Sequence, residues 1–161
     1  LYAAGCRSIQ IDDCTWSSLL DSEIVKTYHI DVERIASLLL KANNAALENK
    51  PEDLVVFAHE NVDAFYLEYD DERSGTFEAL QFIPKNKQVV LGVITSKRPE
   101  LEDEAFLEQR VAKAAEYFPL DNLCLSPQCG FASTEEGNSL SEDEQWAKVD
   151  LVVRTAKKIW G

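Results

Sequence analysis

The sequence lacks the long apolar segments and the basic surface that are typical of membrane and nucleic-acid-binding proteins. No apolar run approaches the roughly 20 residues that a membrane-spanning helix needs. The first residues show no basic stretch followed by an apolar one, so we expect no secretory signal. The chain carries 16 Lys and Arg against 29 Asp and Glu, for a formal net charge of −13. Because this charge repels phosphate backbones and anionic lipid surfaces, we expect neither nucleic acid nor a membrane as its partner. Since neither a membrane span nor a secretory signal is visible, we expect a cytoplasmic protein.

Cysteine and histidine are also scarce, which limits the kinds of site the chain can build. Its four cysteines, Cys6, Cys14, Cys124 and Cys129, form no CxxC pair, and there are only two histidines. This spacing favours free thiols in a reducing compartment over a disulfide framework. A cysteine with a function of its own is therefore expected to be a catalytic group or a metal ligand.

What the sequence does contain is an alternation of strand and helix patterns. Apolar residues at helical spacing predict helices over about 31–48 and 99–118, and a capping box at Ser141 and Glu144 predicts a last helix. Short apolar runs predict strands over 8–12, 54–56, 64–70, about 88–94 and 123–126. Near-continuous apolar strands between helices indicate a parallel sheet covered on both faces.

Polar or reactive residues follow each predicted strand. Side chains placed at the carboxyl ends of successive strands are typical of a (β/α)₈ barrel. A doubly wound open sheet places its ligands at the same ends, so this pattern by itself leaves both folds open.

One connection between predicted strands is too short. Only residues 57–63, "FAHENVD", separate the strand at 54–56 from the next one, whereas a parallel crossover needs a dozen residues or more. The two strands are therefore antiparallel, or residues are missing. Because this stretch has no glycine and resembles the end of a helix, we favour a segment missing between Val56 and Phe57. About five strands fit in the chain and a complete barrel has roughly 250 residues, so we also expect a front half to be absent.

Two side chains at strand ends are candidate metal ligands. Glu68 and Cys129 carry a carboxylate and a thiol, both of which bind Zn²⁺. The alternative is that Cys129 is a small buried apolar residue and Glu68 a solvated acid. His59 precedes its strand, which would place it at the opposite face of a barrel, and His29 is expected in a loop.

Other candidate site residues can also be explained without a functional role. Asp12 and Asp13 follow the apolar stretch "IQI" and could receive a substrate ammonium group, or could form an Asx-type turn. The stretch "YDDERSG" is an active-site loop or a charged turn, and Cys6 and Cys124 are expected in the core.

Five longer stretches carry a resemblance to a known family. They are "IQIDDCTW", "VDAFYLEYDDERSG", "VVLGVITSKRPELED" and "PLDNLCLSPQCGFAST", followed by "EDEQWAKVDLVV". In order and spacing they resemble the C-terminal catalytic barrel of cobalamin-independent methionine synthase, and more closely its shorter single-barrel bacterial relatives. The resemblance runs nearly from end to end, and it implies that residues 1–161 are the C-terminal portion of one (β/α)₈ TIM-type barrel.

The resemblance also implies a chemistry and a set of site residues. It implies a zinc-dependent transfer of a methyl group from 5-methyltetrahydrofolate to the thiol of homocysteine, which yields methionine. Glu68 in "LEYDD" and Cys129 in "SPQCG" match two zinc ligands of the family, and Asp12 in "IQIDD" matches the aspartate that binds the homocysteine amino group.

This sequence departs from the family pattern at three places. The family's His-x-Cys pair of zinc ligands has no counterpart, and it would belong between Val56 and Phe57. The family's proton-donating histidine falls on Thr95, and its folate-contacting glutamate falls on Ser18. These departures leave two alternatives open: a related thiol methyltransferase with another donor or acceptor, and a non-catalytic paralogue without a complete zinc site.

Overall fold

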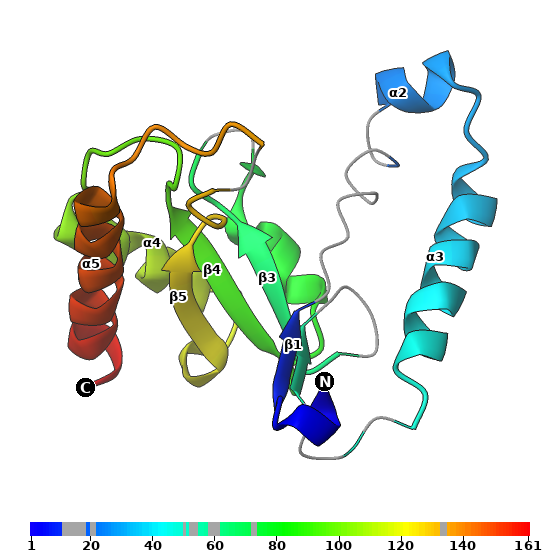
Figure 1. Ribbon diagram of the computed structural model, residues 1–161, viewed down its shortest axis with the longest axis horizontal. Coiled ribbons are helices and arrows are strands. Elements are labelled where there is room, and N and C mark those ends of the chain that lie inside the picture. The colour runs from blue at the N-terminus through cyan, green and yellow to red at the C-terminus, as the bar shows by residue number, and fades with distance from the viewer. Residues whose placement is uncertain are drawn as a thin grey trace. The chain divides into compact units, whose positions relative to one another are not determined.

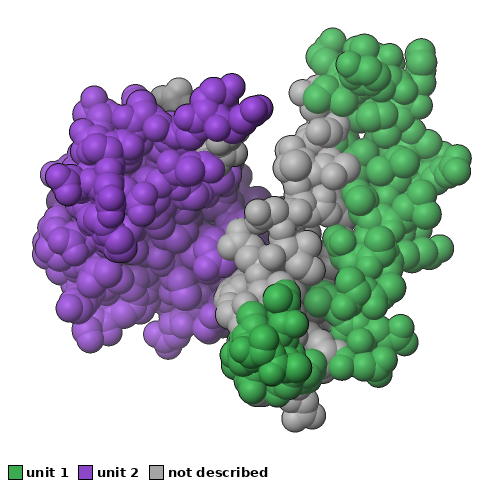
Figure 2. All heavy atoms as spheres, viewed as in Figure 1, with its two compact units in different colours: residues 1–64 green, residues 65–161 purple. Residues whose placement is uncertain are grey.

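The computed structural model describes residues 1–10, 19, 22–49, 51, 55–57, 62–71, 74–132 and 135–161. The chain divides into two compact units, Leu1–Ala64 and Phe65–Gly161, which Figure 2 shows in different colours. Several residues considered above lie outside the described part of the chain: Asp12, Asp13, Cys14, Ser18 and His59.

Short parallel strands pair in the first unit. Strand β1 (Ser8–Gln10) pairs with β2 (Val55–Phe57) over three residues, from Ser8 opposite Val55 to Gln10 opposite Phe57. Phe57 also pairs in parallel with Ala64, the first residue of β3 (Ala64–Glu68). The antiparallel alternative for the short connection is therefore wrong. So is the prediction that Phe57 belongs to the end of a helix, because Phe57 is the last residue of β2 and pairs with Gln10 and Ala64.

The predicted helix of the first unit forms, and a shorter helix that was not predicted precedes it, but neither buries any of its residues. A 3₁₀ turn, η1 (Tyr2–Ala4), ends at Gly5, whose φ of 96° lies in the left-handed region that favours glycine. Helix α2 spans Ser22–Thr27 and α3 spans Val32–Ala46. Asp31 caps α3, since its carboxylate accepts from the Arg34 N–H at 3.0 Å. No residue of α2 or α3 is buried.

Parallel strands also form the sheet of the second unit. Strand β4 (Gln88–Ile94) pairs in parallel with β5 (Leu123–Pro127), from Val89 opposite Leu123 to Ile94 opposite Pro127. Just beyond β3, the Tyr69 N–H donates to the carbonyl of Gly92 at 2.9 Å. The three strands run in the same direction, so their carboxyl ends lie at one edge (Figure 1).

Two helices and two 3₁₀ turns complete the second unit. They are η3 (Phe77–Phe82), α4 (Glu104–Ala115), η4 (Leu120–Asn122) and α5 (Glu142–Trp160). Helix α4 contacts β4, η3 and α5, and α5 also contacts β5. No helix in the described ranges is long and apolar enough to cross a bilayer.

The ends of these helices confirm one prediction and correct another. The capping box of α5 is present, because the Ser141 N–H donates to Glu144 Oε2 at 2.7 Å and the Glu144 N–H donates to Ser141 Oγ at 3.4 Å. Helix α4 begins at Glu104 and not at Pro99. The Asp103 carboxylate caps it by accepting from the Phe106 N–H at 2.8 Å.

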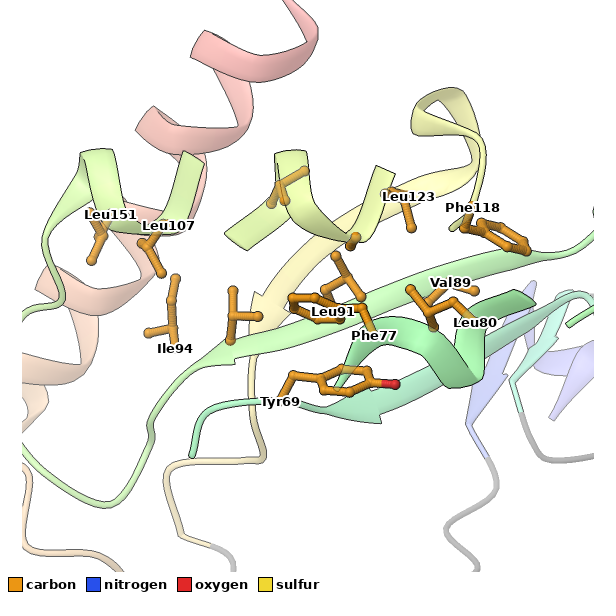
Figure 3. Close-up of a cluster of buried hydrophobic side chains, with 13 residues drawn as sticks. Tyr69, Phe77, Leu80, Val89, Leu91, Ile94, Leu107, Phe118, Leu123 and Leu151 are labelled. Atoms are coloured by element: carbon orange, nitrogen blue, oxygen red, sulfur yellow. The ribbon is translucent and has the colours of Figure 1, made fainter. Parts of the chain in front are cut away.

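The core of the second unit lies between the sheet and its helices (Figure 3). Strand β4 is buried from Val89 to its end, as an apolar strand covered on both faces should be. Strands β3 and β5 are only partly buried, so the prediction of full coverage is wrong for them. Cys124 is likewise half-buried and not in the core, and its partial burial raises the pKa of its thiol. The core side chains are Tyr69, Phe77, Leu80, Val89, Leu91, Val93, Ile94, Leu107, Val111, Ala114, Phe118, Leu123 and Leu151.

Candidate functional site at the carboxyl edge of the second unit

Polar residues of three strands meet at the carboxyl edge of the sheet. Glu68 ends β3, the stretch 95–97 (Thr-Ser-Lys) follows β4, and the stretch 128–130 (Gln-Cys-Gly) follows β5. The parallel strands bring these segments to the same edge, although they lie far apart in the sequence. This edge is the candidate site.

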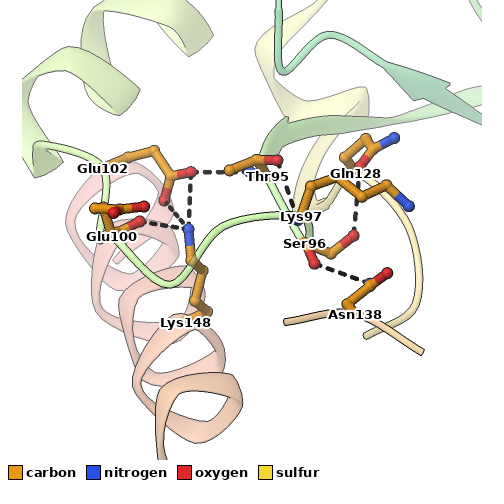
Figure 4. Close-up of polar contacts among 8 residues, drawn as sticks. All are labelled: Thr95, Ser96, Lys97, Glu100, Glu102, Gln128, Asn138 and Lys148. Atoms are coloured by element: carbon orange, nitrogen blue, oxygen red, sulfur yellow. Dashed lines mark hydrogen bonds and ion pairs between the residues drawn. The ribbon is translucent and has the colours of Figure 1, made fainter. Parts of the chain in front are cut away.

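A chain of two hydrogen bonds connects the three strand ends. The side-chain amide of Gln128 donates from Nε2 to Glu68 Oε2 at 3.1 Å. Its other end accepts, because Ser96 Oγ donates to Gln128 Oε1 at 3.3 Å (Figure 4). Ser96 is fully buried, whereas Glu68 is exposed. The amide therefore links a fixed hydroxyl to a carboxylate that faces solvent.

The turn that carries Cys129 is held on both sides of the cysteine. The Gln128 N–H donates to the Ile94 carbonyl at 2.7 Å. On the other side, the Asn138 amide donates to the Gly130 carbonyl at 3.2 Å and to the Ser96 carbonyl at 2.9 Å. Cys129 is itself exposed and has a free thiol. Its neighbours thus fix the backbone of the turn while the sulfur stays accessible.

Gly92 allows β4 to pack closely against this turn. A Cβ atom at Gly92 would lie 2.9 Å from Gln128 Cα, 3.2 Å from the Leu67 carbonyl oxygen and 3.3 Å from the Pro127 carbonyl oxygen. Contacts to backbone atoms at these distances leave no room for a side chain. The glycine is required by the close approach of the neighbouring strands.

A buried ion pair holds the segment after β4 (Figure 4). Lys148 of α5 is fully buried and donates to both carboxylate oxygens of Glu102, each at 3.1 Å, and to the Glu100 carbonyl at 2.6 Å. Glu102 Oε1 also accepts from the Thr95 N–H at 2.8 Å. A buried charge is tolerated when it is paired and hydrogen-bonded in this way. The pair ties α5 to the backbone beside Ser96.

Acidic side chains line a shallow depression next to Glu68. Its volume is about 360 Å³, and its lining residues are Glu68, Asp70, Asp71 and Ser74. The concentration of carboxylates attracts cations and repels anions. On the buried side of the same segment, Arg110 donates to the Tyr69 carbonyl at 2.6 Å and lies 4.5 Å from the centre of the Phe77 ring. Burial raises the pKa of the Tyr69 hydroxyl, and the nearby Arg110 charge opposes that rise.

The structure places two of the three predicted site residues at one edge of the sheet. Glu68 lies one hydrogen bond from Gln128, the residue that precedes Cys129. Asp12 lies outside the described residues. Within the described ranges, no group of three or more His, Cys, Asp or Glu side chains is placed to hold a metal ion. His29 is exposed in the turn before α3, as expected.

Sequence reasoning missed the polar residues that support this edge. Gln128 stands between the proline and the cysteine of "SPQCG", and the family motif assigns a role only to the cysteine. Lys148 had a recognisable signal, since it falls on the helical stripe of α5 that also contains Leu151 and Thr155. A lysine on a buried stripe indicates a buried partner for its charge.

Comparison with known proteins identifies the family of the chain. The family model described as "Cobalamin-independent synthase, Catalytic domain" matches residues 1–158, nearly the whole chain. The chain belongs to the cobalamin-independent methionine synthase family. The resemblance found in the sequence motifs is thereby confirmed.

Similar proteins include two from Bacillus subtilis (strain 168). The uncharacterized proteins YxjH and YxjG are 40% and 39% identical to this member of the family, each over 189 residues. Each match covers 99% of this chain and 50% of the relative. The chain thus spans about half the length of these curated relatives.

Solved structures of the family share the fold. A Listeria monocytogenes protein assigned as a vitamin-B12-independent methionine synthase superposes with a TM-score of 0.81 at 40% identity, over 99% of this chain and 50% of that one. The B12-independent methionine synthase from Shewanella sp. W3-18-1, solved in complex with selenomethionine, superposes with a TM-score of 0.72 at 17% identity, over 98% of this chain and 50% of that one. The second likeness shows the fold alone.

The matched stretch is longer in the relatives than in this chain. The match to YxjH extends over 189 residues, whereas this chain has 161, so at least 28 positions have no counterpart here. The connection from Phe57 to Ala64 is also far shorter than the dozen residues that usually join parallel strands.

Proposed function

We propose that the protein is a methyltransferase that moves a methyl group from 5-methyltetrahydrofolate to the thiol of homocysteine, in the cytoplasm and with the help of Zn²⁺. One observation carries the proposal: a chain of this family holds Glu68 and the Cys129 turn together through a single amide, that of Gln128. We further propose that residues 1–161 are the C-terminal portion of one (β/α)₈ barrel.

Glu68 and Cys129 are residue types that bind zinc, but two ligands do not complete a zinc site. A carboxylate and a thiol are both zinc ligands, and both are exposed at the same edge. A catalytic zinc has three protein ligands and an exchangeable position. We propose that the further ligands are the family's His-x-Cys pair, on a segment missing between Val56 and Phe57. The 28 or more unmatched positions of YxjH support a missing segment.

Each proposed site residue has a distinct role. Glu68 and Cys129 would bind the metal, and zinc when bound lowers the pKa of a coordinated thiol so that it becomes a nucleophile at neutral pH. Asp12 would bind the amino group of homocysteine and so orient it. The acidic depression beside Glu68 suits a substrate that carries an ammonium group.

A different methyl donor is the second candidate, and Thr95 favours it. The methyl group of a methyl-folate sits on a tertiary amine, which must be protonated to leave. Thr95 occupies the position of the family's proton-donating histidine, and it is buried with its hydroxyl accepting from the Lys97 N–H at 3.2 Å. An unbound threonine hydroxyl is a far weaker acid than an imidazolium, so a donor with a better leaving group fits this residue.

Metal analysis of the full-length protein tests the proposal. We expect one zinc per chain, lost in Cys129→Ser and Glu68→Ala and kept in Cys124→Ser, since Cys124 is half-buried within β5. Methionine formation from homocysteine should then be assayed with 5-methyltetrahydrofolate and with an activated methyl donor such as a methylsulfonium compound.

The outcomes separate the candidates. Methionine formed only with methyl-folate supports the first function, and methionine formed only with the activated donor supports the second. A protein with neither zinc nor thiol-dependent methyl transfer is the non-catalytic paralogue, and this result would overturn the proposal.

A further inference from the structure

We infer that Gln128 is a positioning residue for the metal ligand Glu68, and that Ser96 acts on the same carboxylate through Gln128. The inference rests on the proposed function, because it concerns how Glu68 is presented to a divalent cation. It assigns a role to two residues that carry no ligand atom themselves.

The Gln128 amide is held at both ends. Ser96 Oγ donates to Oε1 at 3.3 Å, and Nε2 donates to Glu68 Oε2 at 3.1 Å. The reverse orientation would bring Oε1 against a carboxylate oxygen, where two acceptors repel each other. The Glu68 carboxylate, which only accepts, therefore selects one of the two orientations of the amide, and Ser96 anchors the other end of the amide.

The backbone of Gln128 is fixed where the side chain begins. Its N–H donates to the Ile94 carbonyl at 2.7 Å, and its Cα lies where a Cβ on Gly92 would be only 2.9 Å away. Ser96 is also fixed, since it is fully buried and its carbonyl accepts from the Asn138 amide at 2.9 Å. The Gln128 amide is thus attached to a fixed backbone at one end and bonded to the fixed Ser96 hydroxyl at the other.

The consequence falls on Glu68, which is exposed at the end of β3. A free glutamate side chain samples many rotamers and loses this freedom when it binds a metal. The hydrogen bond from Gln128 to Oε2 restricts the carboxylate beforehand, and Oε1 takes no part in that bond. Partners that hold a metal ligand in this way commonly change metal affinity by about 10–100-fold when they are removed.

Zinc affinity, measured with the metal alone against a chromogenic chelator, tests the inference. Gln128→Met keeps the length of the side chain and removes the donor, and we expect zinc binding to weaken by about 10–100-fold. Ser96→Ala should weaken binding in the same direction but less, because the amide remains bonded to Glu68 and loses only its anchor at Oε1. Gln109→Met, the same substitution at an exposed position of α4, should leave the affinity unchanged.

The double variant Ser96→Ala/Gln128→Met gives the sharpest readout. If Ser96 acts through Gln128, the double variant should bind zinc as Gln128→Met does, so that the two effects are not additive. If Ser96 had only a structural role, Ser96→Ala would weaken zinc binding by the same factor in the wild type and in Gln128→Met. That result would overturn the role assigned to Ser96. If Gln128→Met fails to fold by circular dichroism, Ser96→Ala alone must still weaken binding relative to Gln109→Met.

The remaining outcomes distinguish this inference from the proposed function. A full-length wild-type protein that binds no zinc overturns both. Zinc binding that is equally tight in the wild type, Gln128→Met and Ser96→Ala overturns the positioning role and leaves the proposed function standing.

Discussion

The two units differ in whether their amphipathic helices bury apolar side chains. In residues 65–161, α4 and α5 bury apolar side chains against β4 and β5, and the core there is continuous. In residues 1–64, α3 is amphipathic and capped by Asp31, but none of its residues is buried. The apolar stripe is therefore sufficient to predict a helix, whereas its burial requires a surface of matching shape.

The buried ion pair is the feature of the second unit whose loss should have the largest effect. Lys148→Met leaves the Glu102 carboxylate, which is 16% exposed, without its cation. Breaking such a pair costs about 3–5 kcal/mol of unfolding free energy. Urea denaturation followed by circular dichroism should show this loss. Lys157→Met, at an exposed position of α5, serves as the control and should change stability by less than about 0.5 kcal/mol.

A second substitution, at Glu102, tests whether the unpaired carboxylate causes the loss of stability in Lys148→Met. Lys148→Met combined with Glu102→Gln should recover much of the lost stability, because the neutral amide oxygen can still accept from the Thr95 N–H. Equal stabilities for Lys148→Met and Lys157→Met would contradict the structural importance of the pair.

A matched pair of leucine truncations compares the two units directly. Leu91 in β4 is 0% exposed and Leu38 in α3 is 52% exposed. Leu91→Ala should cost about 2–5 kcal/mol through lost burial and a cavity. Leu38→Ala should change stability by less than about 0.5 kcal/mol. Hydrogen exchange read by peptide should show faster exchange across β4 and β5 only for the first variant. Similar costs for both would mean that α3 is buried by a surface in the full-length protein.

A pair of glycine substitutions tests how closely β4 and β5 pack at the site. Gly92→Ala forces a methyl group against backbone atoms of Gln128, Leu67 and Pro127, which should cost about 1–3 kcal/mol. Gly130→Ala, two residues beyond Gln128, meets no atom within 4 Å and should be tolerated. The midpoint of thermal unfolding should be lower for Gly92→Ala than for Gly130→Ala. Equal midpoints would argue against the close approach of β4 and β5.

The smallest expected effect is the pH dependence of the first turn of α5. Hydrogen bonds from the backbone and side chain of Ser141 lower the pKa of the Glu144 carboxyl. Because the folded pKa is the lower one, the stabilisation is present above the unfolded pKa of about 4.3 and is lost as the pH falls through the folded value. The protection factors of the amides at the start of α5, which correct for the intrinsic pH dependence of exchange, should therefore fall in acid, and Glu144→Gln should remove this dependence. An unchanged pH profile in that variant would assign the effect to another carboxyl group.

Local sequence signals predicted most of the secondary structure. The caps at Asp31 and Ser141, the apolar run of β4 and the order of elements in the second unit all follow from interactions over a few residues. The helical pattern predicts a start of α4 at Pro99, but the helix begins at Glu104, because Glu102 is bonded to Lys148 and to the Thr95 N–H. The pattern also places Phe57 at the end of a helix, whereas its pairing with Gln10 and Ala64 in the sheet makes it part of β2.

The candidate site was predictable only in part. Glu68 and Cys129 were identified from the family motifs, and the parallel strands explain why residues so distant in sequence share an edge. The link between them was not predictable, since Gln128 and Glu68 are separated by 60 positions and neither residue type specifies the other.

The sequence by itself determined the caps at Asp31 and Ser141, the apolar run of β4 and the family motifs that the chain carries. Only the tertiary structure decided that Gln128 joins Ser96 to Glu68, that Lys148 pairs with Glu102, and that the stripe of α3 stays unburied. The reason is physical: caps and periodicity depend on neighbours along the chain, whereas hydrogen bonds between strand ends and the burial of a helix face depend on which surfaces the fold brings together.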